Sequence, residues 1–217
     1  LFPTYASNEQ LGTSGDKVEA YQQYLDRYVA EVKPALISYD NYQFFVGSDG
    51  DDYFLNLEMV RKAALKHKLP FLNIIQASSW DPDVRVPNGD ELRFLTYTTL
   101  AYGGLGLSHY VYNYPVDHKG MIIGNDGQPT HLYHAAKYIN PEFEAIAAEL
   151  INCKSIGAYH VGMVPPGAQA LPENAPFTIQ SDVLNEPGAY EWVSKKPVKG
   201  FVLGYFAAAG KRKVSYV

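Results

Sequence analysis

The sequence has little of what several classes of protein depend on. Its one cysteine, Cys153, excludes an internal disulfide and a metal cluster built from several thiolates. No uninterrupted apolar run reaches the roughly 18 residues that a membrane-spanning helix requires, so no membrane span is expected. Charged residues make up only 19% of the chain, the net charge is -5, and the one basic cluster, Lys211-Arg212-Lys213, lies in a predicted hairpin turn. A surface that binds nucleic acid phosphates is therefore not expected.

Signals for a cofactor or a metal ion are also missing. His131 and His134 lie three residues apart on one predicted helix, but no further metal ligand accompanies them. Gly103, Gly104 and Gly106 come before a predicted strand, whereas the glycines of a phosphate-binding loop follow one. We therefore expect neither a cofactor nor a metal site.

The sequence does contain a regular alternation of strand-like and helix-like segments. Apolar strand-like runs begin near Leu1, Ala35, Pro70 and Gly106, at intervals of 34, 35 and 36 residues. One helix-like segment separates each pair of runs. Strands that are apolar along their whole length and alternate with amphipathic helices predict a parallel sheet covered on its outer side.

Capping residues mark where the helices begin. The pairs Asp16-Glu19 and Asn88-Glu91 have the spacing of a capping box. A further helix is predicted over residues 52–69. Thr130 is expected to cap the last helix, which Asn140-Pro141 should interrupt, because proline lacks the N–H that a helix interior needs.

The period of about 35 residues fits a (β/α)8 TIM barrel, although an open doubly wound sheet has the same local pattern. Only four strand-helix units are present, so residues 1–150 are predicted to form the C-terminal half of a barrel, with the other half expected upstream of residue 1. After Leu150 the pattern changes to short strand candidates between turns rich in proline and glycine. Residues 151–217 are therefore predicted to begin a β-rich, β-sandwich-like domain.

In a barrel, functional groups gather where the strands end. Here these positions are rich in aromatic and amide side chains, which suit a sugar because a flat ring covers the apolar face and amides bond the hydroxyls. With 18 tyrosines in the chain, filling of the space between strands and helices is the alternative explanation. The predicted substrate-binding residues are Tyr5, Asn41, Tyr42, Gln76, Trp80, Tyr112 and Asn113.

Asp40 is the carboxylate that closes an apolar strand at this edge, and it is the predicted catalytic residue. It could act as an acid, a base, a nucleophile or an acceptor for a substrate hydroxyl, and the alternative is an aspartate that caps the backbone of its own loop. Gln76 closes the next strand in PFLNIIQASSW, where the apolar run gives way to small polar residues.

Five segments together resemble the second half of a clan A glycoside hydrolase barrel of the β-galactosidase-like type. They are LFPTYASNEQLG, YLDRYVAEVKPALISYDNYQF, NLEMVRKAALKHKLPFLNIIQAS, ELRFLTYTTLAYGGLGLSHYVYNYP and GMIIGNDGQPTHLYHAAKYIN. The resemblance implies that ALISYDNY, PFLNIIQAS and GLSHYVYNY are barrel strands six, seven and eight. It also implies an acid/base at the end of strand four, upstream of this sequence, and a nucleophile at the end of strand seven, where Gln76 stands.

The function expected from this resemblance is hydrolysis of a poly- or oligosaccharide through carboxylate acid/base catalysis, outside the cytoplasm in an extracellular or periplasmic location. An amide cannot act as the nucleophile, which leaves four interpretations of Gln76. The nucleophile is another residue such as Asp40, the enzyme inverts, a natural glutamate has been replaced, or the protein is a non-catalytic carbohydrate-binding barrel. A metal-dependent sugar isomerase and an aldolase are further alternatives on the same scaffold.

Overall fold

The computed structural model describes residues 16–114, 116–177, 179, 200–208 and 213–216. Two helices lie early in the chain: α2 (Lys17–Val32) follows Asp16, whose side chain accepts a hydrogen bond from the Glu19 N–H, and α3 is Tyr53–His67. α4 (Gly89–Ala101) starts with the predicted capping box, in which both reciprocal bonds of Asn88 and Glu91 are present. None of the described helices is both long and apolar enough to cross a bilayer.

The fourth described helix corrects one prediction. α5 (His131–Leu150) begins at Thr130 as expected but continues through Pro141 as a single helix. Proline removes one N–H donor from the helix interior without ending the helix when its flanking turns are held by packing. Here Ile139 and Phe143, on either side of the proline, are both buried, and α5 packs along α4.

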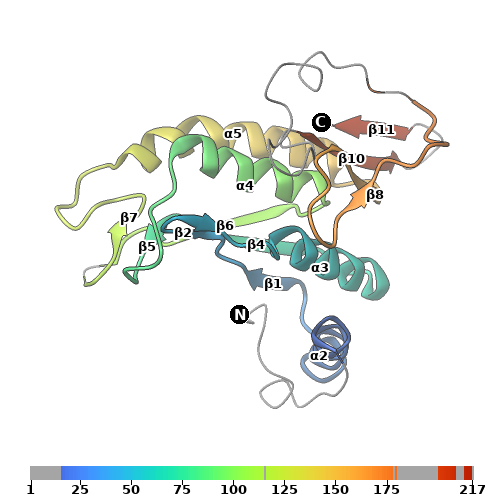
Figure 1. The fold of residues 1–217 in the computed structure, drawn as a ribbon, viewed down its shortest axis with the longest axis horizontal. Coiled ribbons are helices and arrows are strands. Elements are labelled where there is room, and N and C mark those ends of the chain that lie inside the picture. Colours follow the sequence, from blue (N-terminus) through green and yellow to red (C-terminus); the bar gives the residue numbers. More distant parts are fainter. Residues whose placement is uncertain (1–15, 115, 178, 180–199, 209–212, 217) are drawn as a thin grey trace.

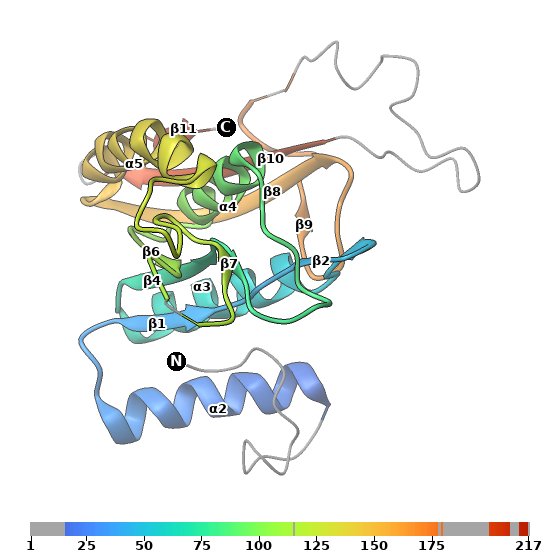
Figure 2. The ribbon, with the colours of Figure 1, turned by 90° about the vertical axis from the view of Figure 1, so that its left-hand side faces the viewer.

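Three parallel strands form the central sheet, in the order β1 (Ile37–Asp40), β4 (Phe71–Gln76) and β6 (Gly106–Tyr110). Alternate residues of β1 and β4 are buried on the face that meets the helices, where the Asn73 amide donates to the Thr99 hydroxyl of α4 at 2.8 Å. Figures 1 and 2 show α2 beyond the β1 edge of this sheet, where it packs on α3, and α4 and α5 together at the far end of the molecule from α2.

The predicted (β/α)8 barrel is wrong. The described residues form a mixed α/β structure with small sheets, and among them the parallel sheet has only three strands and does not close. The run near Leu1 lies outside the described residues. Local strand-helix alternation specifies parallel pairing between successive strands, and that pairing is present. The number of strands and the closure of a sheet depend on strand tilt and stagger, which the local pattern does not encode.

The C-terminal part forms one four-stranded sheet, in the order β11 (Lys213–Tyr216), β10 (Gly200–Ala208), β8 (Cys153–Gly162) and β9 (Gln169–Ala170). It lies beside the ends of α4 and α5 (Figure 1). The residues that the structure describes here form this single sheet rather than two stacked sheets of a sandwich. β10 approaches α4 closely: a Cβ added at Gly204 would lie 2.5 Å from the Ala101 carbonyl oxygen.

A buried ion pair joins α3 to the C-terminal sheet. The Arg61 guanidinium contacts the Glu58 carboxylate at 3.2 Å and donates to the Ser155 hydroxyl at 2.9 Å, while the Gln169 amide donates to Glu58 at 2.8 Å. Glu58 and Arg61 are almost fully buried, at 2% and 5% exposure. We call Glu58, Arg61, Ser155 and Gln169 the buried clamp, after its two buried charges; Gln169 itself is exposed. A buried charge is tolerated only when it is paired and hydrogen-bonded, so each member requires the others.

Removing one charge of the buried clamp should therefore be costly. We expect Glu58→Ala to lower the free energy of unfolding by about 3–5 kcal/mol, because it leaves the Arg61 guanidinium buried and unpaired. The double variant Glu58→Met/Arg61→Met should lose much less. Urea denaturation followed by circular dichroism measures both. Glu31→Ala is the control, since Glu31 forms an exposed pair with Arg27 and should change stability by less than about 1 kcal/mol. Equal losses in all three variants would contradict this account.

Candidate functional site

The carboxyl ends of the three parallel strands bring together residues far apart in the sequence. β1 ends at Asp40, β4 at Gln76 and β6 at Tyr110, and the last two are paired in the sheet register. The loops that follow contain two short antiparallel ladders, β2 (Phe44–Phe45) with β3 (Ser48–Asp49), and β5 (Ser78–Ser79) with β7 (Lys119–Gly120). These ladders give the loops a fixed shape at the polar edge of the sheet.

Asp40 lines a pocket of about 550 Å³ at this edge. Its carboxyl is half-buried, and burial raises its pKa above the ordinary value of 3.8, an effect that the hydrogen bond from the Tyr42 hydroxyl partly opposes. A carboxyl with a raised pKa holds its proton to higher pH and can serve as a general acid. The other lining residues are Asn41, Tyr42, Phe45, Asp52, Trp80, Asp81, Asp83 and Val84.

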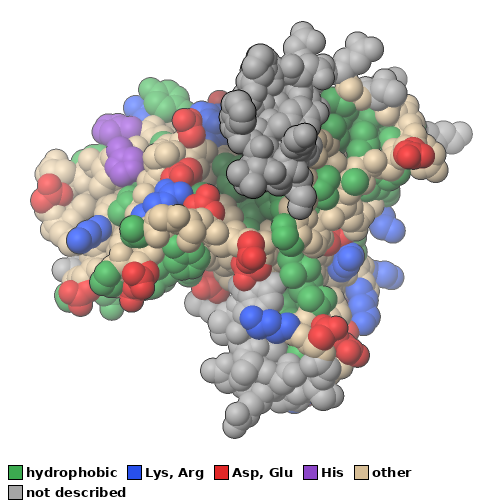
Figure 3. All heavy atoms as spheres, in the orientation of Figure 1, with side chains coloured by type: hydrophobic (Ala, Val, Ile, Leu, Met, Phe, Trp, Pro, Cys, Tyr) green, Lys and Arg blue, Asp and Glu red, His purple; other side chains and the backbone are tan. Residues whose placement is uncertain are grey.

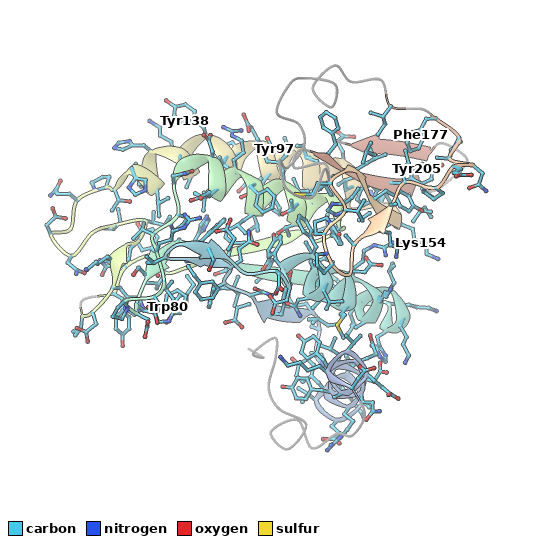
Figure 4. All side chains as sticks on the ribbon, viewed as in Figure 1. Trp80, Tyr97, Tyr138, Lys154, Phe177 and Tyr205 are labelled. Atoms are coloured by element: carbon cyan, nitrogen blue, oxygen red, sulfur yellow. The ribbon has the colours of Figure 1, made fainter. Side chains whose placement is uncertain are left out.

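An aromatic cluster stands beside Asp40. The ring of Tyr42 lies 4.8 Å from that of Trp80 and 5.1 Å from that of Tyr110, and Trp80 and Tyr110 meet edge to face at 5.2 Å. His118 packs on Tyr110, with the ring centroids 5.7 Å apart. Figure 4 shows Trp80 at the rim of the molecule below the sheet, away from the helices. Trp80 is partly exposed, so this wall of the pocket offers an aromatic surface.

Gln76 has a different place from the one predicted. Its side chain is completely buried and is absent from the lining of the Asp40 pocket. The amide oxygen accepts from the Phe44 N–H at 3.0 Å, and the amide nitrogen donates to the carbonyls of Phe44 at 3.2 Å and Arg85 at 2.8 Å. All the polar atoms of this amide are thus used by the backbone. The arrangement requires a glutamine, because a carboxylate has no N–H to donate to the two carbonyls.

The remaining predicted binding residues divide into two groups. Asn41 lines the Asp40 pocket, but it is buried and its amide nitrogen lies 3.3 Å from the Asp52 carboxylate, so it mainly holds the loop. Tyr112 is 61% exposed and lines a separate pocket beside α5. The Asn113 amide donates to the carbonyls of Ile123 and Gly124, which fixes its own loop. Tyr5 lies outside the described residues.

Tyr110 and His118 pack in the aromatic cluster beside the site, although neither lines the Asp40 pocket, and neither was predicted. β6 ends at Tyr110, two residues earlier than the apolar run suggests, and the sequence therefore predicted Tyr112 as the binding residue at this strand end. The position of Tyr110 near the end of a predicted strand was the only sequence feature that could have indicated it. His118 carried no local signal, because it reaches the cluster through the fold of the loop between β6 and β7. In the part of the chain that the structure describes, no three His, Cys, Asp or Glu side chains are grouped to hold a metal ion.

Comparison of the chain with protein-family models, with curated proteins and with solved structures gives no match.

The contacts of Gln76 give a sharp test of its role. We expect Gln76→Glu to lower the free energy of unfolding by about 3 kcal/mol and to give no gain in glycan turnover, because the carboxylate would be buried against two carbonyl oxygens. Thermal and urea unfolding measure the first effect, and release of reducing ends measures the second. Gln128→Glu, at an exposed position, is the control and should be close to neutral. A stable, more active Gln76→Glu protein would show that this position is a disabled nucleophile site.

Proposed function

We propose that the protein is a glycoside hydrolase that binds a poly- or oligosaccharide in the Asp40 pocket, with Asp40 as its proton-transferring carboxylate. The observation that carries the proposal is a half-buried, pKa-raised carboxyl that is hydrogen-bonded by Tyr42 and lines one pocket with the Tyr42 and Trp80 rings, which cluster with Tyr110. The resemblance of five segments to clan A glycoside hydrolases supports the same reading.

The aromatic wall is suited to a sugar ring. Stacking of a pyranose on Trp80 would bury its C–H face, while Asp40 and the Tyr42 hydroxyl at the pocket floor would bond its hydroxyl groups. The pocket volume of about 550 Å³ is sufficient for one or two sugar residues. Four aspartates line it together with the aromatic rings, a mixture that suits a hydrated ligand better than a purely apolar one.

Hydrolysis needs a second carboxylate in addition to the acid. Asp52, Asp81 and Asp83 line the same pocket as Asp40. Asp81 accepts from the Asp83 N–H in a local turn at 2.9 Å, and Asp52 is bonded by Asn41. Of the three, only the Asp83 carboxylate accepts none of these hydrogen bonds, and it is our candidate for the partner of Asp40.

A non-catalytic carbohydrate-binding protein is the second candidate function. The commitment of Gln76 to the backbone favours it, because the strand end at which the resemblance implies a nucleophile contributes no reacting group. The two candidates share the aromatic wall and differ in whether Asp40 moves a proton. Glycan turnover and glycan binding must therefore be measured separately.

Asp40→Asn separates the two functions. For a hydrolase we expect turnover of a bound glycan to fall by about 10²–10⁴-fold, because the amide cannot deliver a proton, while affinity changes little. Reducing-end release on a panel of polysaccharides and calorimetric binding provide the two readouts. Binding without turnover in the unmodified protein would select the binding function, and unchanged turnover in Asp40→Asn would remove Asp40 from the mechanism.

The same variant has a predictable effect on stability. Because the folded-state pKa of Asp40 is raised, the folded protein holds this proton more tightly than the unfolded chain, so the stabilisation is present below about pH 4 and is lost as the pH rises through the folded pKa. Asparagine does not ionise. We expect the melting temperature of Asp40→Asn relative to the unmodified protein to increase from about pH 4 to neutral pH. A difference that is flat with pH would contradict the burial effect.

Trp80→Ala tests the aromatic wall. We expect glycan affinity to fall by about tenfold, corresponding to roughly 1–2 kcal/mol of lost stacking and burial. Tyr138→Ala is the matched control, because Tyr138 is an exposed aromatic on α5, on the opposite side of the molecule from Trp80 in Figure 4. Equal losses in the two variants would indicate non-specific adhesion of the glycan to surface rings.

A further inference from the structure

A second and larger pocket, of about 760 Å³, lies where the β2–β3 hairpin, the first turns of α3 and α4, and the loop after β8 meet. We call it the acidic groove. The hairpin residues that line it are Gln43, Phe44, Asp49 and Gly50, whereas Tyr42 and Phe45 line the Asp40 pocket. The same hairpin therefore contributes to both pockets, and the two have no lining residue in common.

The floor and one wall of the acidic groove are aromatic and aliphatic. The rings of Tyr53, Phe54 and Phe94 contact one another with centroids 5.1–5.8 Å apart. Phe94 is 38% exposed, and Met163 and Val164 across the groove are 43% and 44% exposed. Exposed apolar side chains that gather in one concave surface mark a binding site more often than scattered ones do.

The charge of the groove has one sign. Among the described residues that line it, none is Lys, Arg or His, whereas Asp49, Asp51, Asp90 and Glu91 all contribute. The guanidinium of Arg85, outside the lining, pairs with two of these carboxylates, those of Asp49 and Glu91. Of the four lining carboxylates, those of Asp51 and Asp90 have no ion pair with any residue that the structure describes. Acidic and hydrophobic side chains also lie side by side near the middle of the face drawn in Figure 3.

Gln43 gives an independent sign of a missing partner. Gln43 lines the groove and is only 6% exposed. Its side-chain amide has no hydrogen-bond partner among the residues that the structure describes. Its amide atoms are not sealed from solvent, so they face the groove and can bond to a ligand that occupies it. By contrast, the side-chain amide of Gln76, which bonds the backbone of the neighbouring residue Phe44, has a partner for both its oxygen and its nitrogen. A ligand that donates to the Gln43 oxygen would satisfy this acceptor from within the groove.

We propose that the acidic groove binds an organic cation with an apolar body, of the arylalkylammonium class. The ammonium group lies at the acidic end, where it donates to Gln43 and is attracted by Asp51 and Asp90, and the apolar body packs on Phe94. This site is distinct from the proposed glycan pocket and does not depend on the proposed function. An anion of the same shape is excluded by the carboxylates, and a neutral analogue keeps only the apolar contact.

The ligand charge is the first variable to test. The probes are 2-phenylethylammonium, neutral 2-phenylethanol and phenylacetate, titrated into the ¹⁵N-labelled 217-residue chain and followed by NMR. We expect the cation to bind at least about tenfold more tightly than the anion, with shifts on the Gln43 side-chain amide, Gly50 and Asn88. Raising the salt concentration from about 50 to 500 mM should weaken the cation severalfold and leave the alcohol unchanged.

Variants then assign the effect to the groove. Asp51→Asn/Asp90→Asn should weaken the cation about five- to tenfold without changing the alcohol, and Phe94→Ala should weaken both. Asp83→Asn is the matched control, because it removes one carboxylate from the other pocket and should leave cation binding unchanged.

Three results would overturn the proposal: equal affinity for the three probes, an absence of shifts at the groove, or an equal loss in Asp83→Asn. If the circular dichroism spectrum shows that a variant is unfolded, the charge series and the salt dependence of the unmodified chain decide the question alone.

Discussion

The polar edge of this molecule depends on the hydrogen bonds of one side chain, the amide of Gln76. It joins the end of the central strand β4 to Phe44 in one loop and to Arg85 in another. The β2–β3 hairpin, which Phe44 begins, is fixed to the sheet by this contact and carries residues of both pockets. The glutamine at this strand end is thus explained by the need for an acceptor and two donors at one buried point.

The parts of the fold that local sequence determines were predictable. The Asn88-Glu91 capping box starts α4, because both of its hydrogen bonds form within four residues, and α3 ends before Pro70. The parallel pairing of successive strands also followed from their apolar composition. Closure into a barrel did not follow, because it depends on how many strands pair and how they are staggered. In the same way, Pro141 predicts a helix end from local sequence, whereas the packing of its buried neighbours Ile139 and Phe143 keeps α5 continuous.

The site was predictable where one strand end supplies it. Asp40 ends β1 and Tyr42 comes two residues later, while Trp80 comes shortly after β4, so the spacing of the sequence predicted that they share one edge of the sheet. Tyr110 and His118 join them through contacts across loops that have no signature in the sequence. The acidic groove could not be predicted from the sequence for the same reason. Its walls come from the hairpin, the starts of two helices and the loop after β8, which only the tertiary structure brings together.

The buried clamp has a consequence for how the groove would receive a ligand. Gln169 follows the loop of Met163, Val164 and the two prolines, and its bond to Glu58 anchors that loop to α3, on which the opposite wall of the groove begins. The loop wall is therefore tethered to α3 by a hydrogen bond to a buried carboxylate, close to the base of the groove. Such a cleft is rigid before its guest arrives, so little entropy is lost in shaping it, and selection among guests would rest on their size and rigidity as much as on their charge.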